Sequence, residues 1–216
     1  VGDHPLNLQA TSLAANAYAC TGDEKYRDWL IEYVDAWCER TAANDGIIPS
    51  NIGLDGTIGG ECDGKWYGGC YGWSFTVTVP QTGAKANRNG VTRAVIGFGN
   101  ALLMTGEQKY IDVWRRMLAT INANAKKVDG QTVYPSMYGD EGWYAYGPHP
   151  YSAGALQAYL WSMDANDRAL ADNDWIRYLE GENPDYPVAA LERALEQLRK
   201  RVEGMRAENA TDDTRL

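Results

Sequence analysis

The sequence contains no apolar run that approaches the roughly 18 residues of a membrane-spanning helix. It also has no excess of positive charge, because 20 Lys and Arg stand against 29 Asp and Glu and the formal net charge is −9. A chain with this charge is a poor partner for nucleic acid or for an anionic membrane surface. We therefore expect neither nucleic acid nor a membrane among its partners.

Metal-binding residues are scarce as well. The chain has two His, His4 and His149, and four Cys. A closed zinc site takes four ligands in one place, so the pair Cys62 and Cys70 would need further partners. Phosphate-binding loops, dinucleotide fingerprints and serine-nucleophile motifs are missing, so we expect no metal and no cofactor. Cys62 and Cys70 share one flexible loop, where they either form a disulfide or remain two thiols. The compartment is not determined by these residues, with a secreted or periplasmic location slightly favoured.

The chain begins with two helical patterns of different character. Residues 6–20 are small and apolar and carry no charge, which predicts a helix buried nearly all round. Residues 24–41 place apolar side chains, Trp29 among them, at helical spacing and charges elsewhere. That pattern predicts an amphipathic helix with one wet face.

The same pair recurs along the chain, which indicates internal repeats. The turn Thr21-Gly22-Asp23-Glu24-Lys25-Tyr26 is echoed by Thr105-Gly106-Glu107-Gln108-Lys109-Tyr110. An extended Pro-Ser segment follows each of these pairs, at Pro49-Ser50 and at Pro135-Ser136. A short helix is expected near residues 175–179, and a short strand pair near 76–79. The predicted first helices of the hairpins are residues 6–20, 91–104 and 152–163, and the predicted second helices are 24–41, 107–125 and 188–205.

Long segments, residues 45–87 and 128–151, connect the hairpins, so the long loops should gather at the N-terminal ends of the charge-poor helices. The charge-poor helices would form an inner ring and the charged helices an outer ring. This arrangement resembles the six-hairpin glycosidase-like superfamily, the (α/α) toroids of glycoside hydrolases and polysaccharide lyases, over roughly residues 4–205. The resemblance implies an all-α toroid or partial toroid, one domain over residues 1–216, with its site among the loops. It carries no catalytic residue over to this chain.

One loop is unusually rich in glycine and aromatic residues. Residues 59–75, called here the Gly-aromatic loop, contain six Gly, five aromatic residues and the acids Glu61 and Asp63. Aromatic faces with carboxylates between them suit a cleft that binds sugars. The alternative is a loop that packs on itself and plugs the helical core.

Glycoside hydrolysis needs two carboxyl groups, ~5–5.5 Å apart for retention and ~6.5–9.5 Å apart for inversion. Glu61 and Asp63 stand among aromatic residues, where burial would raise the pKa of a general acid. Asp140 and Glu141 occupy the equivalent loop of the next hairpin and are the predicted base or nucleophile. The predicted substrate-binding residues, with the three Trp as stacking platforms, are His4, Trp66, Tyr67, Trp73, Arg88, Trp143, Tyr144 and His149.

Three functions remain open at this point. The surplus of loop acids over loop bases favours a glycoside hydrolase that acts on an oligo- or polysaccharide. A polysaccharide lyase, which cleaves uronate-containing glycans by β-elimination, would instead use a Tyr or His base and a cation that neutralises the carboxylate. The third reading is a non-catalytic glycan-binding module.

Three hairpins make half of a complete ring, and apolar inner helices need neighbours on both sides. The first residues, 1–5, lack a signal-peptide layout, and the polar tail, 207–216, reads as a loop that leads onward. We therefore expect the open edges to be covered by the remainder of the toroid or by a second copy of the chain.

Overall fold

The computed structural model describes residues 2–80 and 83–207. The polar tail from residue 208 onward lies outside them. The chain divides into two compact units, Val1–Leu170 and Ala171–Leu216. The prediction of one domain over residues 1–216 stays a prediction. No helix within the described ranges is both long and apolar enough to cross a membrane.

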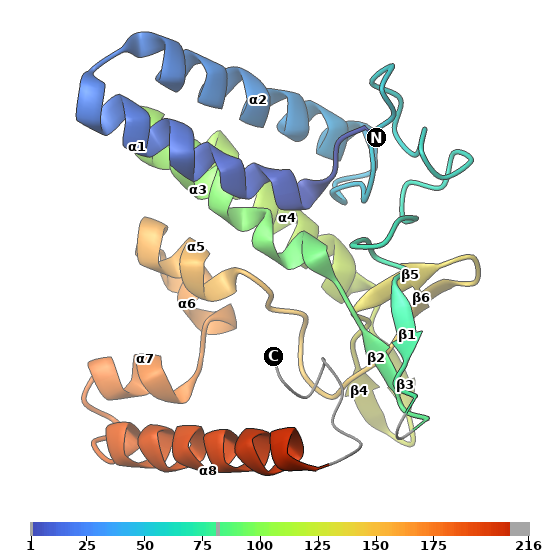
Figure 1. Cartoon of the computed structure of the whole chain (residues 1–216), viewed down its shortest axis with the longest axis vertical. Helices are drawn as coiled ribbons and strands as arrows, with labels where there is room; N and C mark the ends of the chain where they lie inside the picture. Colours follow the sequence, from blue (N-terminus) through green and yellow to red (C-terminus); the bar gives the residue numbers. More distant parts are fainter. Residues whose placement is uncertain (1, 81–82, 208–216) are drawn as a thin grey trace. The chain divides into compact units, whose positions relative to one another are not determined.

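The first unit is built on helical hairpins (Figure 1). Helices α1, α3 and α5 are neighbours, and α2 and α4 pack on α1 and α3. The 3₁₀ turns η1 (Pro5–Ala10) and η2 (Gly90–Arg93) lead into α1 and α3 and contact each other. The paired helices are α1 (Thr11–Thr21) with α2 (Glu24–Ala43), α3 (Val95–Thr105) with α4 (Lys109–Ala123), and α5 (Ala155–Ser162) with α6 (Ala165–Leu170).

The repeated Thr-Gly turn has the same hydrogen bonds in both places. The hydroxyl of Thr21 donates to the carbonyl of Ala17 at 2.7 Å, and that of Thr105 donates to Ala101 at 2.8 Å. The glycine after each Thr is in the left-handed region, with φ of +67° at Gly22 and +74° at Gly106, which lets the helix end there. The sequence repeat is therefore a structural repeat.

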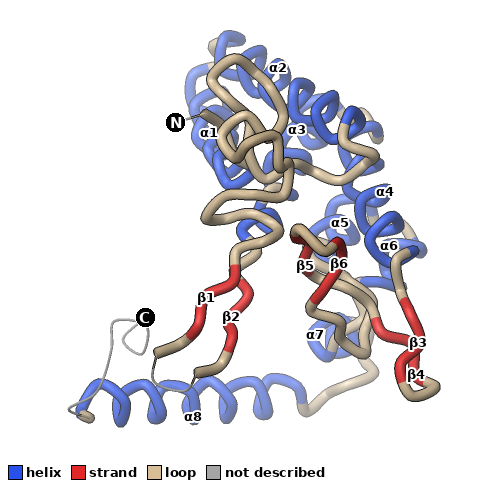
Figure 2. The backbone as a smooth tube through the Cα atoms, turned by 90° about the vertical axis from the view of Figure 1, so that its right-hand side faces the viewer, coloured by secondary structure: helices blue, strands red, loops and turns tan. Residues whose placement is uncertain are grey.

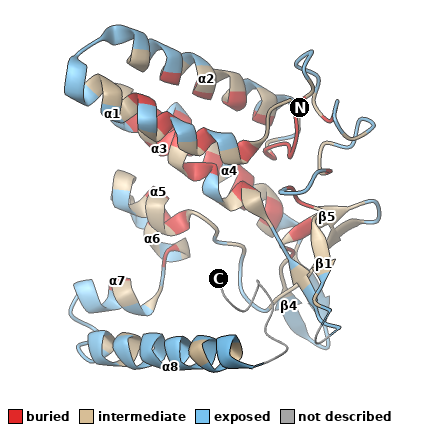
Figure 3. Ribbon diagram, in the orientation of Figure 1, coloured by how far each residue is buried: buried red, intermediate tan, exposed pale blue. Residues whose placement is uncertain are grey.

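The core lies between the two helix layers, where the buried residues of α1 to α4 meet (Figure 3). Trp37, Phe98 and Trp114 are fully buried. Two glycines let α3 approach its neighbours closely. A Cβ added at Gly97 would lie 2.6 Å from Leu8, and one at Gly99 would lie 2.2 Å from the ring of Trp161.

Two predictions about these helices were wrong. Helix α1 is not buried nearly all round, because Leu13 is 74% exposed. The helix packs against α2, α3 and η1, and these contacts leave part of its surface open. Trp29, predicted on the buried stripe of α2, is 46% exposed. Its ring instead stacks on Tyr33 with the centroids 5.3 Å apart. Helical spacing identified the stripe but not its edges.

The long loops contain three antiparallel two-stranded sheets (Figure 2). In the first, Thr76 pairs with Asn87 and Thr78 with Lys85, which confirms the strand pair expected near residues 76–79. The strands are β1 (Thr76–Thr78) with β2 (Lys85–Asn87), β3 (Lys126–Val128) with β4 (Gln131–Val133), and β5 (Met137–Gly139) with β6 (Gly142–Tyr144).

These sheets overturn the predicted fold class. The structure is 53% helical and 11% strand, so it is a mixed α/β protein and not an all-α toroid. The physical reason is that backbone N–H and C=O groups need hydrogen-bond partners, and the segments between hairpins provide part of them by pairing into short two-stranded ribbons. Strands of three residues are too short to show an alternating pattern in the sequence.

The second unit contains α7 (Asp174–Leu179) and α8 (Tyr186–Arg206). The side chain of Asn173 caps α7 by accepting from the backbone N–H groups of Trp175 and Ile176, each at 3.0 Å. This confirms the short helix expected near residues 175–179. The third hairpin was predicted wrongly, because α5 pairs with α6, whereas the helix expected as its second member is α8 of the second unit.

Candidate functional site

The Gly-aromatic loop is held in place by a buried amide. The Nδ2 of Asn51 donates to the carbonyls of Lys65 and Gly68, each at 3.1 Å, and its Oδ1 accepts from the backbone N–H of Glu61 at 3.2 Å. Asn51 is 5% exposed, so these bonds are shielded from water. Asn51 was not among the predicted site residues, because its only signal in the sequence is its place beside the repeated Pro-Ser segment.

The far end of the loop is anchored in the core by Trp73. Its ring N–H donates to the carbonyl of Ile48 at 2.8 Å, and its backbone N–H donates to the hydroxyl of Ser50 at 2.9 Å. Trp73 is fully buried, so its ring is not available to a ligand as a stacking platform. At Trp73 the loop therefore packs into the core, as the alternative interpretation of this loop predicts.

The neighbouring rings form a continuous cluster that joins the loop to the β5–β6 ribbon. The backbone N–H of Tyr138 donates to the carbonyl of Trp73 at 3.1 Å. The ring centroid of Tyr138 lies 4.7 Å from that of Trp66, 5.2 Å from that of Tyr67 and 5.0 Å from that of Trp143. The aromatic cluster is defined here as Trp66, Tyr67, Trp73, Tyr138 and Trp143, of which all but Trp73 are partly exposed.

Asp140, at the tip of the β5–β6 ribbon, is tied to the edge of this cluster. Its Oδ1 accepts from the Nζ of Lys65 at 2.7 Å and from the hydroxyl of Tyr67 at 2.8 Å. The bond from Lys65 and then the bond from Tyr67 lower the pKa of the Asp140 carboxyl. The same bond to Asp140 is the main reason why the pKa of Tyr67 is raised. Asp140 is therefore ionised and Tyr67 protonated at neutral pH.

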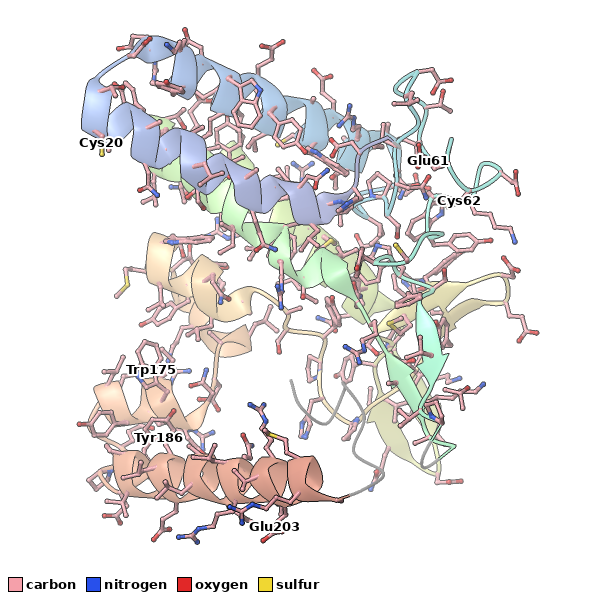
Figure 4. All side chains as sticks on the ribbon, in the orientation of Figure 1. Cys20, Glu61, Cys62, Trp175, Tyr186 and Glu203 are labelled. Carbon is pink, nitrogen blue, oxygen red and sulfur yellow. The ribbon has the colours of Figure 1, made fainter. Side chains whose placement is uncertain are left out.

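The other three predicted catalytic acids are exposed on their loops. Glu61, labelled in Figure 4, accepts from the backbone N–H of Gly2. Asp63 adopts a left-handed backbone conformation with φ of +53°, and Glu141 lies beside Asp140 in the β5–β6 turn. The burial that was expected to suit Glu61 or Asp63 to acid catalysis is therefore absent.

Near the start of η1, Asp3 is a second carboxylate with many partners. It forms backbone pairs with Ile52 and lines a cleft of about 300 Å³ together with Arg40. Next to it, the ring of His4 lies 6.1 Å from that of Tyr71, and its Nδ1 has no partner in the described structure. The groups that donate to the Asp3 carboxylate are the backbone N–H of His4 and the side chains of Asn7, Tyr33, Trp37 and Arg40.

The remaining predicted binding residues lie on separate segments. The Tyr144 hydroxyl is 3.0 Å from the hydroxyl of Thr76, which links the β5–β6 and β1–β2 ribbons. Arg88 is exposed, and its backbone N–H donates to Phe75 at 2.8 Å. His149 is exposed in the loop before α5.

Cys62 and Cys70 are free thiols in the structure. Cys62, labelled in Figure 4, is partly buried, and this burial raises the pKa of its thiol. The described residues contain no group of three or more His, Cys, Asp and Glu that could hold a metal ion.

The fold and the loops thus define a mixed helical-hairpin protein with an aromatic, acid-bearing surface on its connecting segments. Its sequence matches the model of a family described as a domain of unknown function (DUF8034) over residues 1–134 and 167–215, and the chain belongs to that family. Comparison with curated proteins and with solved structures gave no match. The resemblance to six-hairpin glycosidases stays a prediction.

Proposed function

We propose that this chain binds an oligo- or polysaccharide at the aromatic cluster. One observation carries the proposal. The Asp140 carboxylate accepts hydrogen bonds from the ammonium group of Lys65 and from the hydroxyl of Tyr67, so an ion pair lies next to the partly exposed rings of the cluster. Aromatic faces remove the apolar faces of sugar rings from water, and carboxylate and ammonium groups bind their hydroxyls. Both kinds of group stand at one edge of the cluster.

Glycoside hydrolysis is the second candidate, and one observation favours it. Asp140 is kept ionised by Lys65 and Tyr67, as a nucleophile or general base must be. A hydrolase also needs a carboxyl group whose pKa is raised so that it can donate a proton. Glu61, Asp63 and Glu141 are exposed, which does not supply that environment, so we place binding before hydrolysis.

Cleavage by β-elimination has less support. A lyase base must lose its proton near the working pH. Tyr67 shares the Asp140 carboxylate with the cationic Lys65, yet the bond to Asp140 raises the pKa of Tyr67. The charge pattern around Tyr67 therefore opposes its use as a base.

The proposal is tested by titrating the full chain with a panel of neutral and uronate-containing oligosaccharides in a calorimeter. Replacing Trp66→Ala removes a stacking face, and Asp140→Asn removes the charge that holds Lys65. We expect each change to weaken binding about tenfold, ~1.4 kcal/mol. Assays of reducing ends and of unsaturated products on the same panel report hydrolysis and elimination.

Trp29→Ala is the matched control, because Trp29 is an exposed Trp of α2 that is not part of the aromatic cluster. It should leave the affinity unchanged, and circular dichroism should show that all three variants remain folded. If no glycan binds, or if Trp66→Ala and Trp29→Ala bind equally well, the proposal is wrong.

A further inference from the structure

Helix α8 exposes a long apolar stripe. It has no buried residue and is pale blue along most of its length in Figure 3. Leu191 is 61% exposed and Leu198 is 57% exposed. The stripe, called here the α8 seam, follows alternating steps of three and four residues and consists of Val188, Leu191, Leu195, Leu198, Val202 and Met205.

This spacing is the heptad repeat of a two-stranded coiled coil. Val188, Leu195 and Val202 occupy the a positions, and the other three residues of the seam occupy the d positions. An ion pair of the helix lies on the opposite side, where the Nζ of Lys200 contacts the carboxylate of Glu196 at 2.7 Å. All six seam positions are therefore apolar, and the charges lie beside the seam or behind it.

Within the second unit, the seam is left open by α7. The contact between the two helices is made near their facing ends, where the ring of Tyr178 lies 6.0 Å from that of Tyr186. Tyr186 is the first residue of α8 (Figure 4) and precedes the seam. A helix with six apolar residues in water needs a partner of matching length.

We propose that α8 pairs with α8 of a second copy of this chain as an antiparallel coiled coil. The charges at the e positions select this partner and this orientation. Asp185, the N-cap residue just before the helix, and Glu192 of its N-terminal half occupy the first two e positions, and Arg199 and Arg206 of the C-terminal half occupy the last two. In an antiparallel pair, e positions face e positions. Glu192 then faces Arg199 of the second copy, and Asp185 faces Arg206.

Twofold symmetry makes each of these contacts occur twice. A parallel pair would instead bring g positions against e positions, which places Arg201 beside Arg206 of the second copy. In the parallel pair, two Arg–Arg contacts would repel each other, and neither the Glu192–Arg199 nor the Asp185–Arg206 contact would form. Antiparallel helices also bring opposite ends of their dipoles together. The seam supplies the affinity, and the flanking charges fix the direction.

The test is sedimentation equilibrium of the full chain at several concentrations. The wild type should be a dimer. Glu192→Arg and Arg199→Glu should each raise the dimer dissociation constant about tenfold, because each turns two attractive contacts into repulsive ones. The double variant carries the same pair with its charges exchanged and should return to within about threefold of the wild type.

Lys200→Glu is the matched control, because it makes the same charge change one residue away on the outward side of α8. It should leave the dissociation constant within about threefold of the wild type. The proposal is overturned if the wild type is a monomer up to about 0.5 mM, if Lys200→Glu weakens the dimer as much as Arg199→Glu, or if the double variant stays as weak as the single ones.

Discussion

Asn51 organises the candidate site through a single side chain. It satisfies two carbonyl groups and one N–H group of the Gly-aromatic loop, none of which has a regular strand or helix to pair with. The loop then presents Lys65, Trp66 and Tyr67 toward the β5–β6 ribbon. The site's geometry therefore depends on a residue that would not itself touch a ligand.

Replacing Asn51→Ala should loosen the whole loop. It removes the buried Asn51 donor from the carbonyl of Gly68 and leaves the carbonyl of Lys65 with the N–H of Gly68. We expect the free energy of unfolding to fall by about 2 kcal/mol. Glycan binding should weaken as well, because Trp66 and Tyr67 lose their fixed positions. Urea-induced unfolding measures the free energy of unfolding. Faster protease cleavage within the loop shows that the loop has become disordered.

Asn51→Asp separates the two halves of this role. It keeps an acceptor for the N–H of Glu61 but replaces the donor to Lys65 and Gly68 by a second oxygen. It should therefore lower the free energy of unfolding at least as much as Asn51→Ala does. Asn124→Ala is the control, because Asn124 is exposed and its side chain donates to the carbonyl of Thr120 in the helix turn before it. An equal loss of stability in Asn124→Ala would contradict the special role of Asn51.

For single residues, the sequence predicts which side chains form the aromatic surface better than it predicts where each side chain lies. The abundance of aromatic residues in residues 59–75 indicated an aromatic surface, and Trp66 and Tyr67 do form a cluster with Tyr138 and Trp143. It could not show that Trp73 faces the core, because a ring that lines a cleft and a ring that plugs it have the same local sequence. Asn51 was missed because its partners are ten or more residues away and follow no periodic pattern.

Among the elements, α4, α5 and α6 are joined by one buried carboxylate. Asp167 of α6 is 6% exposed and accepts from Arg115 of α4, with Nε at 2.9 Å and Nη2 at 2.6 Å. Ser162 of α5 donates to it as well. Burial opposes ionisation of Asp167, but the bonds from Arg115 and Ser162 outweigh it, and its pKa is lowered.

This lowered pKa makes the contribution of Asp167 to stability depend on pH. A carboxyl group whose pKa is lower in the folded state stabilises fully above its unfolded pKa of ~3.9, and the contribution is lost as the pH falls through the folded value. Asp167→Asn should therefore cost about 3 kcal/mol at pH 7. The difference from the wild type should shrink below about pH 4, measured by urea-induced unfolding across pH 3–7.

Glu24→Gln provides the comparison for an exposed pair, since Glu24 contacts Arg27 at 3.2 Å on the surface of α2. It should change the free energy of unfolding by less than ~1 kcal/mol. A cost for Asp167→Asn that is the same at pH 3 and pH 7 would show that the carboxylate does not stabilise through its charge.

The elements were predicted where a local signal marked them. Helices α1 to α4 have apolar spacing and Thr-Gly turns, and their predicted bounds differ from the observed ones by a few residues. The pairing of the third hairpin was wrong because α6 is only six residues long, too short to show a period. The long amphipathic α8 was the more visible candidate, although the structure places it in the second unit.

For the whole molecule, the error in fold class came from the connecting segments. The helical hairpins were visible in the sequence, but the resemblance to a toroid extended them to an all-α ring, whereas the loops form three small sheets. The family to which the chain belongs is described as one of unknown function, so any proposal about function has to be argued from the residues themselves. The proposed function therefore depends on the aromatic cluster and Asp140.

The buried core and the α8 seam lie in different units, which permits a last prediction. All residues of the hydrophobic core cluster fall within the first unit. A chain that ends at Leu170 should therefore still unfold cooperatively, with a midpoint within about 5 °C of the full chain when followed by circular dichroism. Because it lacks α8, it should sediment as a monomer. Loss of cooperative unfolding would contradict an independent core, and a truncated dimer would place the contact between copies somewhere other than α8.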